Sequence, residues 1–153
     1  MQLDQTDKNI LRLLQEDAEM TMRDMGQRLH LSTTPIFERI KKLKLSGLIR
    51  RSTIILDRSK LPPRITAYCD VSLRHHSKDG LEDFERHVSE LIEVKECYHI
   101  AGQFDYLLRI EVADMQAYQS FISQKLASID HVGRVRSAFV MKEVQRNIAT
   151  EVF

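Results

Sequence analysis

The sequence predicts an α+β protein, with a helical N-terminal domain followed by a ferredoxin-like β-α-β-β-α-β domain. Before Pro62 and Pro63, apolar side chains recur mainly at spacings of three and four, as in amphipathic helices. After the two prolines, apolar and polar side chains alternate in several segments, which is typical of strands. The charge also divides there: residues 1–60 carry 12 Lys and Arg against 8 Asp and Glu, a net of +4, and residues 61–153 carry 11 against 14, a net of −3.

These observations predict three parts within the 153 residues. Residues 1–57 are expected to form a helix-turn-helix domain, winged by a strand at its end. Residues 58–64 are expected to be a stiff linker, because the adjacent prolines restrict φ and disfavour helix before them. Residues 65–153 are expected to form the ferredoxin-like domain.

The first two helices are predicted from the residues that can cap their N-termini. Asp4 can cap a helix that carries Asp7 in its first turn, where negative charge suits the helix dipole. This helix is expected to end near residues 17–19. Thr21 can cap the second helix, with Asp24 three residues further on in a capping-box arrangement.

The third helix is the most informative stretch. Ser32 or Thr33 can cap it, Pro35 suits its first turn and Gly47 suits its end. An apolar stripe of Ile36, Ile40 and Leu43 is predicted to be buried. The opposite face is polar and cationic: Thr33, Thr34, Phe37, Glu38, Arg39, Lys41, Lys42 and Lys44.

That outer face has the residue types that duplex DNA requires. Lys and Arg contact phosphates, and short polar side chains near a helix N-terminus read base edges in the major groove. A connection of about three residues, 30–32, joins the second and third helices, as in a helix-turn-helix. We therefore predict binding to double-stranded DNA; the alternative is a charged face that is merely solvated.

Residues 48–57 are rich in β-branched side chains and are predicted to form a strand or wing beside the helices. Within the run, Arg50 and Arg51 can contact phosphates. The alternative is that they only protect a solvated strand edge.

The C-terminal domain is predicted element by element. Its strands are expected at 65–73, 94–101, 104–112 and 132–141, and its helices at 77–91 and after Asp114. Both helices would then cover one side of the sheet. Tyr68, Tyr98 and Ile100 are expected on the other side, and an apolar uncovered face there would favour dimerisation with a second copy.

Composition excludes several classes. No apolar run approaches a membrane span and no signal sequence precedes the first helix, so we expect a cytoplasmic protein. Cys69 and Cys97 lie in strand-like runs and are expected to be reduced core thiols. A metal site of Cys97 and His99, joined by His75 or His76, is the weaker alternative.

Four motifs in this order resemble those of the Lrp/AsnC (leucine-responsive, feast/famine) family of transcriptional regulators. They are Leu3-Asp4-x-x-Asp7 with Ile10-Leu11, the run from Leu31 to Leu43, Gly47-Leu48-Ile49, and Gly102-x-Phe104-Asp105-Tyr106. The resemblance implies a DNA-binding helix-turn-helix and a ligand-sensing domain that dimerises through its sheet. It further implies tetramers or octamers with amino acids bound between dimers.

The resemblance also implies roles for particular residues. It assigns DNA contacts to Ser32, Thr34, Pro35, Arg39 and Lys42, to which the residue pattern adds Thr33, Glu38, Arg50 and Arg51. It assigns effector binding to the turn of Gly102, Gln103, Phe104 and Asp105, with Arg134 and Ser137 on the last strand.

Two of these positions depart from the family pattern, and the turn has a second interpretation. Glu38 stands where many relatives have a basic or neutral residue, which predicts a different operator. Gln103 replaces the usual Asp or Asn, so the identity of the effector is open. Gly102 can instead serve only to supply a positive φ, and Asp105 only to accept hydrogen bonds from nearby amides.

The predicted function is thus a sequence-specific transcriptional regulator that responds to an amino acid or a related metabolite, with no cofactor. The alternative is an architectural DNA-compacting protein with no effector. No catalytic triad, phosphate loop or metal-ligand spacing appears in the sequence, so we do not expect an enzyme.

Overall fold

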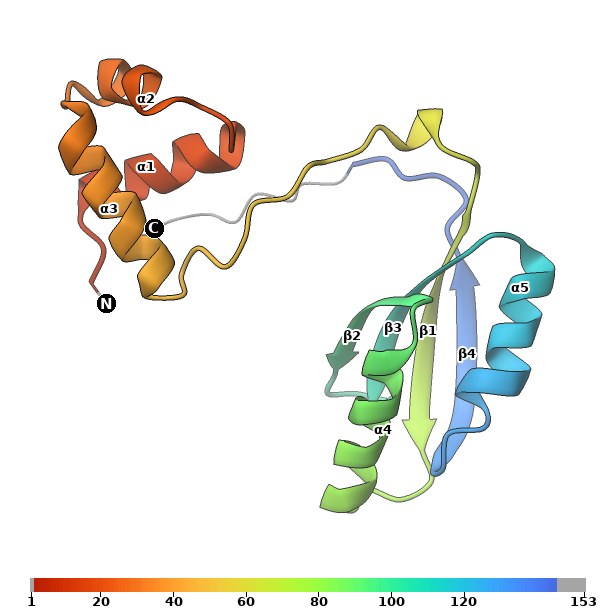
Figure 1. The fold of residues 1–153 in the computed structure, drawn as a ribbon. Helices are drawn as coiled ribbons and strands as arrows, with labels where there is room; N and C mark the ends of the chain where they lie inside the picture. Colours follow the sequence, from red (N-terminus) through yellow and green to blue (C-terminus); the bar gives the residue numbers. More distant parts are fainter. Residues whose placement is uncertain (1, 146–153) are drawn as a thin grey trace. The chain divides into compact units, whose positions relative to one another are not determined.

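The computed structural model describes residues 2–145, which form two compact units. One unit contains the chain up to Leu56 and the other runs from Asp57 to Val144. Within the described residues, no helix is both long enough and apolar enough to span a membrane. Each unit has its own hydrophobic core. Figure 1 labels the helices and strands of both units.

The N-terminal unit is a bundle of three helices, as the apolar spacing predicted. The helices are α1 (Gln5–Glu16), α2 (Met22–Leu29) and α3 (Thr33–Leu45). One residue from each helix is fully buried in a single shared apolar cluster: Ile10, Met25 and Ile36. Ile40 and Leu43 extend the buried stripe of α3, which confirms which side of this helix faces the core.

Most of the predicted helix ends are confirmed. Asp4 and Asp7 form a reciprocal capping box at the start of α1, and the Thr21 side chain accepts a hydrogen bond from the Asp24 amide. Gly47 follows α3 with a φ of 76°, the left-handed conformation that glycine adopts without strain. Ser32 takes the N-cap position of α3 but makes no side-chain capping hydrogen bond, contrary to expectation.

The turn between α2 and α3 depends on a glycine that the sequence analysis did not identify. The Leu31 amide donates to the Gly26 carbonyl at 3.0 Å, so the chain folds back closely over α2. A Cβ atom at Gly26 would lie 2.6 Å from the Leu31 carbonyl oxygen. His30 ends α2 in the left-handed region, with a φ of 53°.

The strand predicted over residues 48–57 is not formed. Residues 46–49 make turns and a bend, and residues 50–57 have no regular secondary structure in the described chain. A strand requires a neighbour with which to exchange backbone hydrogen bonds. The described part of this unit contains only helices, so the β-branched run has no strand beside it.

The C-terminal unit is the predicted ferredoxin-like β-α-β-β-α-β fold, with a four-stranded antiparallel sheet in the order β2-β3-β1-β4. A short 3₁₀ helix, Arg58–Lys60, lies at its start. The main elements are β1 (Ile65–Leu73), α4 (Lys78–Glu90), β2 (Val94–His99), β3 (Tyr106–Val112), α5 (Met115–Ser120), a π-helical turn (Phe121–Leu126) and β4 (Val132–Phe139).

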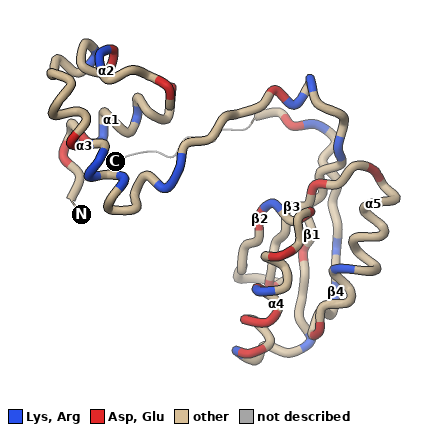
Figure 2. Tube along the Cα trace, in the orientation of Figure 1, with Lys and Arg blue, Asp and Glu red and all other residues tan. Residues whose placement is uncertain are grey.

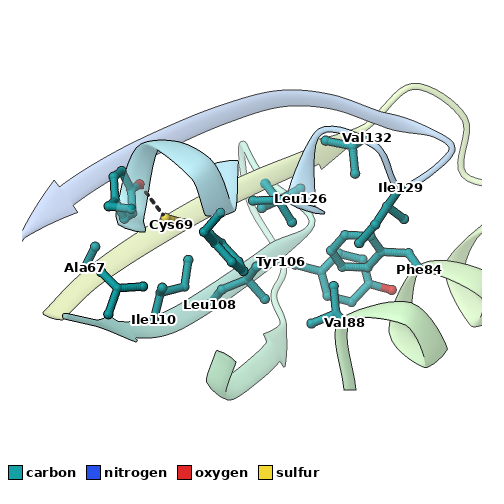
Figure 3. Close-up of a cluster of buried hydrophobic side chains, with 14 of the residues drawn as sticks. Ala67, Cys69, Phe84, Val88, Tyr106, Leu108, Ile110, Leu126, Ile129 and Val132 are labelled. Carbon is teal, nitrogen blue, oxygen red and sulfur yellow. Dashed lines mark hydrogen bonds between the residues drawn. The ribbon is translucent and has the colours of Figure 1, made fainter. Parts of the chain in front are cut away.

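The core of this unit lies between the sheet and its helices (Figure 3). Cys69, Leu108 and Ile110 from the central strands are fully buried, as is Phe84 from α4. The Cys69 sulfur lies 3.1 Å from the Tyr118 hydroxyl of α5. The π-helical turn keeps Phe121 and Leu126, five residues apart, within this same core.

The face of the sheet opposite the helices is less apolar than expected. Tyr68 and Tyr98 lie on it with Leu107, as the strand register requires. Charged groups share this face: the buried Arg109 hydrogen-bonds to the partly exposed Glu96 at 2.7 Å and also to the buried Glu111. The uncovered face is therefore mixed, with tyrosines around a charged network.

One cysteine also differs from the prediction. Cys69 is buried, whereas Cys97 is exposed. Cys97 belongs to β2, which lies at one edge of the described four-stranded sheet and whose residues are mostly exposed.

Candidate nucleic-acid interface and ligand site

The outer face of α3 carries most of the predicted DNA-contacting residues. Ser32, Thr33, Thr34, Glu38 and Lys42 are exposed, and Pro35 is half-buried. Figure 2 shows Lys and Arg positions along the second half of α3 and just beyond it. Short polar side chains thus occupy the start of the helix and cations its end.

The first turn of α3 is open to a partner. Because Ser32 makes no capping hydrogen bond, its hydroxyl does not occupy the first amides of the helix. Arg23 and Gln27 of α2 line a shallow hollow together with Ser32 and Thr33. Arg23 and Gln27 were not among the predicted site residues, although their spacing of four places both on the exposed side of α2.

Arg39 lies elsewhere than predicted. Instead of extending from the outer face, its guanidinium reaches α1, where Nη1 donates to Asp4 Oδ2 at 2.6 Å and to Asp7 Oδ1 at 2.7 Å. The Arg39 side chain is 34% exposed and the Asp7 side chain 10%. The cationic surface of α3 is therefore smaller than the sequence pattern indicated.

Arg50 and Arg51 are both exposed and lie in the segment without regular secondary structure. Because no strand forms there, their alternative role as guards of a strand edge does not apply to the described chain. Arg50 and Arg51 follow α3 by a few residues and therefore extend the positive charge of this helix further along the protein chain.

In the C-terminal unit, the turn before β3 is built around Asp105. Its side chain accepts from the Leu73 amide at 2.7 Å and lies 2.8 Å from Nε2 of His76. Burial by itself would raise the pKa of Asp105, but the Leu73 amide and His76 outweigh burial and hold this pKa below its ordinary value of 3.8. The carboxylate therefore has a clear structural role as an acceptor, as one of our two interpretations held.

The other turn residues differ in exposure. Gly102 and Gln103 are exposed, whereas the Phe104 side chain is only 5% exposed. Gly102 has a φ of 150°, within the region that favours glycine, and a Cβ there would meet nothing within 4 Å. The turn thus presents its backbone to solvent above a buried aromatic ring.

Two arginines of β4 lie over that ring. The guanidinium carbons of Arg134 and Arg136 are 5.7 and 4.8 Å from the Phe104 centroid. Arg136 also forms an ion pair with Asp70 at 2.7 Å. Among the residues that the structure describes, no carboxylate oxygen lies within 4 Å of the Arg134 guanidinium, so its charge remains available to a ligand.

Ser137 does not join this group. It pairs with Cys69 in the sheet register, and its hydroxyl hydrogen-bonds with Tyr118 on the helical side. Arg134 and Arg136 lie on the opposite side of the strand, because alternate residues of a strand face opposite ways. The structure therefore brings Phe104, Arg134 and Arg136 together and leaves Ser137 on the other face.

Residues 2–145 contain no group of three or more His, Cys, Asp or Glu side chains arranged to hold a metal ion. His99 stacks on Tyr106 with a centroid distance of 4.8 Å, and His76 contacts Asp105, so these histidines have roles in packing and hydrogen bonding.

Comparison with known protein families gives two matches. Residues 3–50 match a family of winged helix-turn-helix DNA-binding domains, and residues 66–149 match the Lrp/AsnC ligand binding domain. The first matched segment lies within the N-terminal unit, and residues 66–144 of the second lie within the C-terminal unit.

Individual relatives are similar over nearly the whole chain. The leucine-responsive regulatory protein of Escherichia coli strain K12 is 34% identical over 145 residues, which cover 95% of this chain and 88% of that protein. A transcriptional regulator from Neisseria meningitidis, crystallised as an L-Met complex, has a TM-score of 0.89 at 34% identity, covering 97% of this chain and 96% of its own. An AsnC family transcriptional regulator from Agrobacterium tumefaciens has the same TM-score and coverages at 37% identity.

Proposed function

The chain belongs to the Lrp/AsnC family of DNA-binding transcriptional regulators, and from this premise we propose that α3 reads operator DNA while the C-terminal unit binds an amino acid. One observation carries the DNA part of the proposal. The exposed side of α3 has short polar groups at its start and lysines at its end, over a fully packed apolar stripe. A helix with this arrangement can enter the major groove without exposing its core side.

We assign the contacts by residue type. Ser32, Thr33 and Thr34 are assigned to base edges, because short polar side chains at the start of a recognition helix are the groups that reach them. Glu38 can accept a hydrogen bond from cytosine N4, which fits its exposed position on the same face. Lys42, Arg50 and Arg51 are assigned to phosphates, which fix the register of the protein on the duplex. Because such a protein must reach DNA, we also propose a cytoplasmic location.

The DNA proposal is tested by measuring operator affinity at several salt concentrations. Replacing a phosphate-contacting cation lowers the slope of log affinity against log salt by about one. We expect this loss for Lys42→Gln, and for Arg50→Gln, relative to the parent protein. Lys78→Gln, an exposed lysine of α4, is the matched control and should leave the slope unchanged. If Lys42→Gln and Arg50→Gln both behave like Lys78→Gln, α3 is not the DNA-binding element.

We propose that the effector binds at the turn of residues 102–105, beside Arg134. The Neisseria meningitidis regulator in its L-Met complex supports an amino acid as the ligand class. The Arg134 guanidinium has no carboxylate partner within residues 2–145, and both it and the exposed backbone at Gly102 offer donors to a ligand carboxylate. The Arg134 guanidinium lies over the Phe104 ring in a cation–π contact, which helps to hold it in place. Gln103 adds an exposed amide that can select among side chains.

We further propose that two copies pair through the uncovered face of the sheet, and that pairs assemble into tetramers or octamers. Tyr68 is 38% exposed and Tyr98 51% exposed on that face, and large aromatic side chains are enriched in protein interfaces. A two-fold dimer would present two α3 helices to two half-sites. An effector then changes DNA affinity only if it binds one assembly state more tightly than another.

Calorimetric titration with a panel of amino acids, combined with light scattering, tests the effector proposal. We expect heat of binding with at least one amino acid, and a lower affinity in Arg134→Gln. Arg136→Gln is the matched control: it has the same aromatic support, but Asp70 already neutralises its charge, so a smaller loss is expected. Absence of heat and of any change in assembly with the whole panel would favour an architectural DNA-compacting protein.

A further inference from the structure

Arg39 and the start of α1 form one closed hydrogen-bonded unit. The Asp7 amide donates to Asp4 Oδ1 at 2.8 Å, and the Asp4 amide donates to Asp7 Oδ2 at 3.3 Å. Those two oxygens close the capping box. The other two carboxylate oxygens, Asp4 Oδ2 and Asp7 Oδ1, both accept from Arg39 Nη1. Every oxygen of the two side chains is therefore engaged, and the guanidinium fits only the folded cap.

The position of Arg39 on α3 makes this contact consequential. Its neighbours on the buried side, Ile36 and Ile40, pack in the same apolar cluster as Ile10 of α1. An apolar stripe sets how far α3 lies from α1, but it tolerates small rotations and shifts along the helix axis. Charge-assisted hydrogen bonds to two fixed carboxylates do not tolerate such rotations and shifts, because each bond requires a particular direction and length.

From this geometry we infer that Arg39 is a positioning residue: it holds α3 in the orientation that presents Ser32, Thr34 and Lys42 to DNA, and does not itself contact DNA. This inference rests on the proposed DNA-binding role of α3. It replaces the earlier assignment of Arg39 to the DNA-contacting set.

Charge supports the same assignment. Two carboxylates within hydrogen-bond distance neutralise the Arg39 guanidinium, so it adds little positive field at the DNA face. The hydrogen bond from the Asp7 amide, and to a lesser degree the one from Arg39, hold the pKa of Asp4 below its ordinary value. The Asp4 carboxylate and the Arg39 guanidinium are therefore both charged at neutral pH. By contrast, the first two lysines after Arg39, Lys41 and Lys42, are exposed on α3.

The two roles predict effects of opposite sign when a carboxylate is removed. If Arg39 contacted a phosphate, Asp7→Asn would free the guanidinium and remove a negative charge near DNA, and affinity would rise. If Arg39 positions α3, Asp7→Asn breaks the same unit as Arg39→Gln, and both should weaken operator binding. We expect a loss of about twofold to fivefold for each, with the salt slope close to that of the parent protein.

The experiment uses the full chain with Arg39→Gln, Asp7→Asn, the double variant and Lys42→Gln. Operator affinity is measured by fluorescence anisotropy across a salt series, at a temperature where circular dichroism shows each variant folded. The double variant should bind no more weakly than either single variant, because both changes remove one shared interaction. Asp4→Asn, which removes the more exposed carboxylate, should act in the same direction and less strongly.

The outcomes separate the inference from the proposed function. If Lys42→Gln changes neither affinity nor salt slope, the DNA-binding role of α3 fails. If Lys42→Gln lowers the slope by about one but Asp7→Asn strengthens binding, or Arg39→Gln lowers the slope as much as Lys42→Gln, the inference alone is overturned. Additive losses in the double variant would overturn it as well. Should Asp7→Asn not fold, the sign of the Asp4→Asn effect decides between the two roles.

Discussion

Arg58, at the start of the C-terminal unit, and Glu111, in β3, form an ion pair between residues 53 positions apart in the sequence. The Glu111 side chain is 8% exposed and also accepts a hydrogen bond from Arg109, which in turn binds Glu96. The segment that we predicted to be a stiff linker is therefore anchored at its first residue to the end of β3, one of the two central strands of the sheet. Pro62 and Pro63 then connect this anchor to β1.

Replacing Glu111 should destabilise the C-terminal unit. Glu111→Gln leaves the buried Arg109 and the partly exposed Arg58 without a shared counter-charge, and we expect a loss of about 2 to 4 kcal/mol. Urea denaturation gives the change in unfolding free energy, and amide hydrogen exchange in β3 locates it. Glu96→Gln is the control: its side chain is 34% exposed, so a smaller loss is expected. Equal losses for the two variants would contradict the central role of Glu111.

Asp105 should make the stability of the C-terminal unit depend on pH in acid. Its pKa in the folded protein lies below the ordinary value of 3.8. The carboxylate therefore stabilises the fold fully above that pH, and this contribution is lost as the pH falls through the folded value. Asp105→Asn should be less stable than the parent at neutral pH, and the difference should shrink below pH 3.8.

Thermal unfolding of the parent and Asp105→Asn over a pH series measures this difference, with the exposed Asp130→Asn as control. A difference in stability that stays constant on acidification would show that the Leu73 and His76 contacts do not depend on the charge of Asp105.

The two glycines of the helix-turn-helix should respond to alanine for different reasons. At Gly26, a Cβ would meet the Leu31 carbonyl oxygen at 2.6 Å, so Gly26→Ala should cost about 2 to 3 kcal/mol through a clash with backbone. At Gly47, a Cβ meets nothing within 4 Å, but the φ of 76° should cost about 1 to 2 kcal/mol.

Hydrogen exchange of α2 and α3 in the two variants checks these values. Gly26→Ala should also disturb the α2–α3 turn and weaken DNA binding. A Gly26→Ala protein as stable as Gly47→Ala, with unchanged DNA affinity, would mean that the turn relaxes without cost.

Glu38 should determine part of the operator preference. If its carboxylate accepts from cytosine N4, Glu38→Ala should relax discrimination at one base pair by about 1 to 3 kcal/mol. Binding selection from a randomised operator pool, carried out on the parent and the variant, would show this as a lost preference for cytosine at a single position. An unchanged selected sequence would remove Glu38 from the set of base-reading residues.

The uncovered face of the sheet should respond to a charge placed among its tyrosines. Tyr98→Asp adds a carboxylate beside Glu96, with which the Tyr98 hydroxyl now hydrogen-bonds at 3.0 Å. We expect the proposed dimer to dissociate at micromolar concentration, as seen by light scattering. Ser89→Asp, on the exposed side of α4, is the control and should leave the assembly unchanged. A Tyr98→Asp protein that stays dimeric would place the interface elsewhere.

Local features of this protein could be predicted from sequence because the interacting groups lie close together in the chain. The caps at Asp4 and Thr21 need partners only three residues away. The apolar spacings of α3 and β3 follow from the periods of helix and strand, so the burial of Ile40 and Leu108 was predictable. Strand alternation alone also places Arg134 and Ser137, three residues apart, on opposite faces, which the family resemblance did not take into account.

The sequence by itself thus determined the order of the elements, the fold class and the polar face of α3, since these depend on spacings within one turn or one strand. The tertiary structure alone decided which charges remain free. Arg39 forms ion pairs with Asp4 and Asp7 at the start of α1. Arg136 forms an ion pair with Asp70, whereas Arg134 has no carboxylate partner among residues 2–145. It also decided that residues 50–57 form no strand. Pairings over such distances depend on how whole elements pack, and no local spacing specifies them.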